Sequence, residues 1–166
     1  MPDRKTDIDG GTSYSLESFD DGVRRMAELL KKLTSSDERQ WGYRKGIPQA
    51  GVYVFFEKGA PTYVGRSDKL SNRIGQHGWR SSDKNGATLA FKMLKRSLSA
   101  QGKAEGEKDA DIAREYDDEF LAQKEKVRSM TYRVVAIDDD LEQHLFETYA
   151  ICKFGTSPHH NDFRNH

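Results

Sequence analysis

A few polar residues, spread along the chain from Tyr53 to Asn161, could together cleave a phosphodiester bond. Hydrolysis of that bond needs an activated water, positive charge near the phosphoryl oxygens and support for the leaving alkoxide. Glu147 lies between Phe146 and Thr148 in a largely apolar stretch. Its oxygens would suit Mg²⁺ or Mn²⁺, with water completing the coordination. An exposed helical glutamate is the ordinary alternative.

Several basic residues are candidates for binding phosphate. The planar guanidinium of Arg73 matches two phosphate oxygens at once, and Arg66 could contact the same group. Lys92, Lys95 and Arg96 lie outside the apolar face of a predicted helix, as candidate contacts to DNA or RNA. A surface arginine on a short helix is the alternative for Arg73.

Tyr53 and Tyr63 are expected on neighbouring strands, where their hydroxyls could converge on the attacking water. A phenol with a pKa near ~10 is a poor base at neutral pH unless a cation or an acceptor draws its proton away. His77, one helical turn after Arg73, could be that acceptor. The alternative is that both tyrosines are core residues with hydrogen-bonded hydroxyls.

Taken in order, these residues resemble the GIY-YIG family of nucleases over about residues 49–163. The matching elements are Gly51-Val52-Tyr53, Tyr63-Val64-Gly65, Arg66, Arg73, His77, Glu147 and Asn161. The resemblance implies a divalent-metal-dependent endonuclease, with DNA as the favoured substrate and Glu147 as the metal ligand. It further implies that one tyrosine activates water, helped by His77 as in one branch of the family. Asn161 would order the end of the site by hydrogen bonds.

Two other functions remain open. A module with this fold could bind nucleic acid through the basic helix without cleaving it. A third possibility is an interaction domain that recruits a partner through the apolar face of residues 16–33. Zinc is disfavoured, because the histidines around Asn161 (His159, His160 and His166) lack the cysteines usual in four-ligand structural sites.

The charge of the chain is unevenly distributed, although its formal net charge is zero. Residues 58–103 contain ten Lys and Arg against two acids, and residues 104–126 contain nine acids against four basic residues. A locally basic surface can attract a polyanion whatever the overall charge. The acidic segment is expected to face away from the substrate.

The chain of 166 residues predicts one α+β domain, a small three-stranded sheet flanked by helices with an extra N-terminal helix. We expect a flexible tail over 1–14, a helix and connection over 15–48, and the nuclease-like domain over 49–166. The helix begins after Ser15, a plausible N-cap, with apolar residues at 16, 19, 23, 26, 30 and 33. This face is expected to pack onto the domain, with a homodimer as the alternative.

The remaining elements follow from the hydrophobic pattern. A hairpin is predicted over 51–56 and 62–65, helices after 68 and over 87–98, a helical acidic stretch, a strand over 132–137 and a final helix ended by Gly155. Cys152 is expected to be buried. No apolar run approaches the ~20 residues that span a bilayer, and the N-terminus lacks a secretory apolar region, so a cytoplasmic protein is expected.

Overall fold

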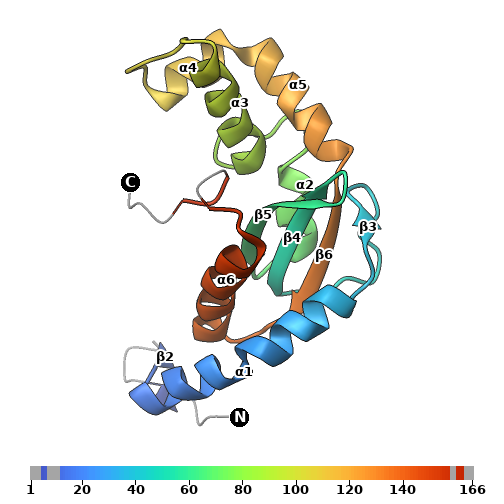
Figure 1. Cartoon of the computed structure of the whole chain (residues 1–166), viewed down its shortest axis with the longest axis vertical. Coiled ribbons are helices and arrows are strands. Elements are labelled where there is room, and N and C mark those ends of the chain that lie inside the picture. The colour runs from blue at the N-terminus through green and yellow to red at the C-terminus, as the bar shows by residue number, and fades with distance from the viewer. Residues whose placement is uncertain (1–4, 7–11, 158–159, 163–166) are drawn as a thin grey trace.

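The computed structural model describes residues 5–6, 12–157 and 160–162, which form an α+β fold (Figure 1). The described helices are α1 (Leu16–Ser35), α2 (Leu70–Gln76), α3 (Thr88–Ala100), α4 (Asp109–Glu115), α5 (Asp117–Arg128) and α6 (Asp140–Phe154). The described strands are β1 (Lys5–Thr6), β2 (Thr12–Ser13), β3 (Arg39–Gln40), β4 (Gly51–Glu57), β5 (Ala60–Ser67) and β6 (Thr131–Ala136).

The central sheet has four antiparallel strands in the order β3-β6-β4-β5, so the prediction of three strands is wrong. The additional strand is β3, which pairs two residues with β6 inside a segment predicted as a connection. The β4-β5 hairpin is confirmed, and its turn residues Lys58 and Gly59 both have positive φ, 51° and 81°. Such a two-residue turn follows the twist of the two strands.

Alternate residues of β4 serve two separate cores, one on each face of the sheet. Val52 and Val54 pack in the core that contains Phe146 of α6 and residues of α1. Tyr53 and Phe55 pack in the other core, with residues of α2, α3 and α5. In Figure 1, α3, α4 and α5 gather at one end of the molecule, and α1 and α6 lie at the other.

Helix α1 buries only part of its predicted apolar face. Ser15 caps the helix as expected, in a capping box with Ser18, and Met26 and Leu33 are buried. Leu16 is 76% exposed, and Phe19 and Val23 are also exposed. The prediction that this face packs onto the domain is therefore confirmed for the second half of α1 and wrong for the first half.

The two ends of α6 follow the sequence signals. Asp139 caps the helix by accepting a hydrogen bond from the backbone N–H of Glu142, and Gly155 ends it with a φ of 64°. The prediction of a buried Cys152 is wrong, because its side chain is exposed. Among the described residues, no helix has both the length and the apolar character needed to span a membrane.

The predicted flexible tail falls mainly on residues outside the described ones. Its described part contains β1 and β2, which pair as a small antiparallel sheet. The boundaries predicted at residues 15 and 49 stay predictions.

Candidate functional site

Tyr53 on β4 and Tyr63 on β5 lie in the same core, with their ring centroids 6.3 Å apart. His77, directly after α2, lies against both rings, and its Nε2 is 2.6 Å from the Tyr53 hydroxyl oxygen. Gly65 faces Tyr53 in the hairpin register, and a Cβ on Gly65 would lie 2.3 Å from the Tyr53 hydroxyl. A glycine is therefore needed here to give the phenol room.

The hydrogen bonds of His77 fix where its proton lies. The backbone N–H of Leu89 donates to Nδ1 over 3.3 Å. Leu89 is in the first turn of α3, where backbone N–H groups have no partner within the helix. A neutral ring that accepts at Nδ1 carries its proton on Nε2 and donates it to Tyr53. The sequence predicted the opposite direction, with His77 as the acceptor.

Burial governs the pKa values in this cluster. Burial lowers the pKa of His77 well below its usual value, and the charge of Arg73 lowers it further. Burial raises the pKa of Tyr53 well above 10.0 and also raises that of Tyr63. Arg73 lowers both phenol pKa values, whereas Glu147 raises them. Both phenols are therefore protonated at neutral pH unless more positive charge arrives.

Arg73 is held by the loop between α2 and α3. Its guanidinium donates to the carbonyls of Asn85 and Gly86, at 3.2 and 3.0 Å, and to the hydroxyl of Thr88 at 2.8 Å. Asp83 shapes this loop by accepting from the backbone N–H groups of Asn85 and Gly86. The sequence carries no signal for this support, because it depends on how the loop folds back onto α2.

Glu147 on α6 is paired with Arg66 on β5, at 3.2 Å between Oε2 and Nε. The glutamate side chain is 27% exposed. Burial raises the pKa of Glu147, while the neighbouring charges of Arg66 and Lys92 lower it. His144 lies three residues before Glu147, and its Nε2 is 2.6 Å from Nη2 of Arg66. Sequence reasoning missed His144, although its helical spacing from Glu147 was a usable signal.

The side chain of Asn161 binds the backbone of β5. Its Oδ1 accepts from the Val64 N–H at 2.9 Å, and its Nδ2 donates to the Val64 carbonyl at 2.8 Å. Asn161 is buried. The amide thereby ties the C-terminal segment to the strand that carries Tyr63 and Arg66.

The three candidate residues of the basic helix differ in their surroundings. Lys92 is partly buried, which lowers its pKa, and the charges of Asp162 and Glu147 act in the opposite direction. Lys95 instead forms an ion pair with Asp109 of α4, at 2.9 Å. Arg96 is exposed. Lys92 acts on the candidate metal ligand, because its charge lowers the pKa of Glu147.

Metal-binding groups are sparse in the described part of the chain. It contains no cluster of three or more histidine, cysteine, aspartate or glutamate side chains arranged to hold a metal ion. His159 and His166, considered above for zinc, lie outside the described residues.

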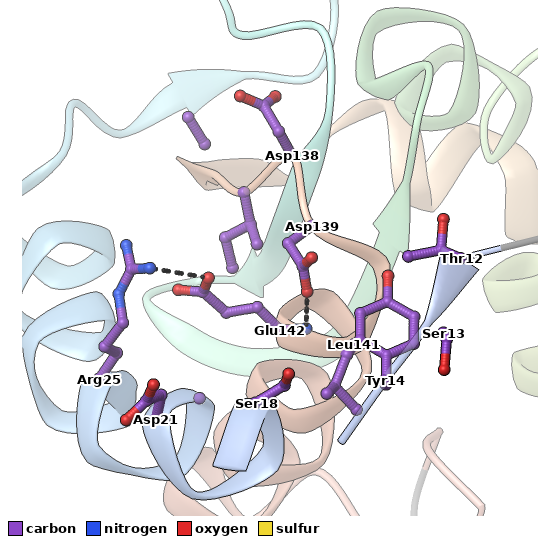
Figure 2. A pocket seen from close by; sticks show the side chains of 13 residues that line it. Thr12, Ser13, Tyr14, Ser18, Asp21, Arg25, Asp138, Asp139, Leu141 and Glu142 are labelled. Carbon is purple, nitrogen blue, oxygen red and sulfur yellow. Dashed lines mark hydrogen bonds and ion pairs between the residues drawn. The ribbon is translucent and has the colours of Figure 1, made fainter. Parts of the chain in front are cut away.

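A pocket lies away from these residues, between α1, the end of β6 and the start of α6 (Figure 2). Its volume is about 670 Å³, and four of its thirteen lining residues are acidic: Asp21, Asp138, Asp139 and Glu142. Glu142 pairs with Arg25 at 3.2 Å, and burial raises the pKa of Glu142. None of the residues predicted to act on a substrate lines this pocket.

No model of a known protein family and no curated protein matches this chain.

Proposed function

We propose that this protein is a GIY-YIG-type endonuclease that hydrolyses phosphodiester bonds in nucleic acid, with DNA as the favoured substrate and a divalent cation as cofactor. One observation carries the proposal. Tyr53 is hydrogen-bonded to His77, and both Tyr53 and Tyr63 are electrostatically coupled to Arg73 and Glu147. These residues come from four separate parts of the chain, and their combination suits phosphodiester hydrolysis.

Tyr53 is the residue best suited to orient the attacking water. Its oxygen accepts the Nε2 proton of His77, so its own hydroxyl proton remains available for donation. A phenol becomes a base only when its pKa falls. Arg73 already lowers the pKa of Tyr53, and a cation near Glu147 would act in the same direction.

Glu147 fits a divalent cation. Its carboxylate is largely buried, burial raises its pKa, and neighbouring positive charges oppose that rise. One protein carboxylate with several waters and substrate phosphate oxygens is a normal Mg²⁺ site. A bound Mg²⁺ or Mn²⁺ would stabilise charge on the phosphoryl and leaving oxygens.

Basic side chains near the tyrosines and Glu147 would bind the substrate phosphates. Arg73 offers a guanidinium near both tyrosines and would stabilise the charge that develops on the scissile phosphate. The charges of Arg66 and Lys92 both lower the pKa of Glu147. The two side chains would contact the phosphate backbone of the substrate.

A cleavage assay tests the proposal on supercoiled plasmid, branched DNA and RNA, with Mg²⁺, Mn²⁺ or EDTA. We expect the parent to cut DNA only with a divalent ion, and Glu147→Ala to lose activity by about a hundredfold or more. Cleavage that persists in EDTA, or in Glu147→Ala, would refute the metal assignment. A parent that binds nucleic acid but cuts none of the substrates would instead support a catalytically silent module.

A further inference from the structure

We infer that His144 is a second protein ligand of the divalent cation, beside Glu147, and that the Arg66 guanidinium holds these two ligands together in the cation's absence. The inference rests on the proposed function, because it concerns the same cation. It adds a ligand to the site and assigns Arg66 a second task.

The guanidinium of Arg66 contacts both proposed metal ligands at once. Its Nε lies 3.2 Å from Oε2 of Glu147, and its Nη2 lies 2.6 Å from Nε2 of His144. These two nitrogens are attached to the same carbon of a planar guanidinium. A carboxylate oxygen and an imidazole nitrogen therefore converge on one cationic group. Residues three apart on α6 lie on the same side of the helix, which places both acceptors toward β5.

The ring of His144 is in the form that binds metals. Its Nδ1 lies 2.7 Å from the Asp140 carbonyl oxygen, which can only accept, so Nδ1 carries the proton. Nε2 faces Arg66, which can only donate, so Nε2 presents a lone pair. Metal-binding histidines usually donate their second ring N–H to a carbonyl or carboxylate in this way.

Arg66 has room to leave this position. Its side chain is 34% exposed, and the ion pair and the hydrogen bond described above both go to acceptors on α6. A divalent cation would repel the guanidinium and take over the same acceptors. The released guanidinium would then be free to bind a substrate phosphate.

The pair of ligands also predicts which metal is preferred. Mn²⁺ also binds carboxylate and water oxygens well, but it accepts an imidazole nitrogen more readily than Mg²⁺, which requires near-ideal octahedral geometry and releases its waters reluctantly. Two protein ligands leave the remaining coordination positions to water and phosphate oxygens. A site of this size agrees with the finding that no larger group of metal-binding side chains occurs among the described residues.

Calorimetric titration of the whole chain with Mn²⁺ and with Mg²⁺, without nucleic acid, tests the inference. We expect His144→Ala to weaken Mn²⁺ binding by about tenfold or more and Mg²⁺ binding much less. Arg66→Met should strengthen the binding of both ions, because a competing cation is removed. Glu119→Gln, an exposed carboxylate on α5, is the control and should leave both affinities unchanged. Thermal unfolding of each variant verifies that it is folded.

The outcomes separate this inference from the proposed function. Unchanged Mn²⁺ affinity in His144→Ala, with binding lost in Glu147→Gln, would overturn the role of His144 and leave Glu147 as the metal ligand. Unchanged or weaker affinity in Arg66→Met would overturn the placement of Arg66 at the cation position. Metal binding that survives Glu147→Gln would instead remove the metal site from the proposed function.

Discussion

At the scale of single residues, the buried tyrosines Tyr53 and Tyr132 of the sheet differ in what their hydroxyl groups bind. The Tyr53 hydroxyl meets His77, whereas the Tyr132 hydroxyl donates to the backbone carbonyl of Tyr43 at 2.6 Å. Both rings are fully buried in the same core. Phenylalanine variants of the two residues can therefore be compared, to separate the proposed catalytic role of Tyr53 from a structural one.

We predict that Tyr53→Phe lowers the cleavage rate by about a hundredfold or more, since it removes the group proposed to orient the attacking water. Tyr132→Phe should cleave at the parent rate. Each variant should lose about 1 kcal/mol of unfolding free energy, because each loses one hydrogen bond, buried at Tyr53 and partly buried at Tyr132. Single-turnover cleavage and urea denaturation measure the two effects. Equal cleavage rates in both variants would contradict a special role for Tyr53.

The pKa of His77 predicts how stability depends on pH. Folding lowers this pKa well below 6.5. Below pH 6.5 the unfolded chain therefore binds a proton at His77 that the folded protein does not bind. Stability is therefore lost as the pH falls from about 7 to 5. His77→Gln keeps a donor and an acceptor but cannot take up this proton. We expect its unfolding free energy to fall less steeply over that range, as measured by urea denaturation at several pH values. An unfolding free energy that falls equally steeply with pH in the parent and in His77→Gln would contradict the prediction.

Part of the site could be predicted from residue types and spacing. Tyr53, Tyr63 and His77 were expected to lie together, and the structure brings them into contact. The direction of the Tyr53–His77 hydrogen bond could not be predicted, because it depends on the Leu89 N–H at the start of α3. The spacing of His144 from Glu147 was a usable signal, but its contact with Arg66, 78 residues away in the sequence, could not be predicted.

At the scale of elements, Asn161 stabilises β5 from outside the sheet. Its replacement by alanine would leave the N–H and the carbonyl of Val64 without these hydrogen bonds. We predict that Asn161→Ala lowers the unfolding free energy by about 1 to 3 kcal/mol, the usual effect of leaving buried polar groups unpaired.

Asn72→Ala provides the control, because Asn72 is exposed on α2. It should change the unfolding free energy by less than about 0.5 kcal/mol. Amide hydrogen exchange should also be faster at Val64 in Asn161→Ala than in the control. Equal stability of the two variants would show that solvent replaces the hydrogen bonds of Asn161 without cost.

Elements with a strong local pattern were predicted well. The hairpin, β6 and α6 were expected from apolar runs, turn residues and caps. Strand β3 was not expected, since two residues are too few to show an alternating pattern. The first half of α1 has the periodicity of a buried helix, but periodicity alone cannot show how far the sheet and α6 extend along it.

At the scale of the whole molecule, the acidic segment neutralises part of the basic one. Asp109 of α4 pairs with Lys95 of α3, and both side chains are 48% exposed. Such a surface pair contributes little to stability, roughly 0 to 1 kcal/mol, but it reduces the positive charge available to a polyanion.

We predict that Asp109→Asn raises the affinity for a DNA duplex by about threefold at low salt, and that the gain shrinks as salt increases. Asp118→Asn on α5 is the control, because it changes the net charge equally at another exposed position. Equilibrium binding with a fluorescent duplex measures both affinities. An equal gain in the control would mean that net charge acts, rather than the release of Lys95.

The two edges of the central sheet determine how one molecule behaves beside another. An exposed edge strand offers free backbone groups that can recruit a strand from a second chain, the first step of many aggregates. One edge here is β3, only two residues long, and the other is β5, where Asn161 occupies the backbone groups of Val64. Both edges therefore disfavour growth of the sheet from one molecule into the next.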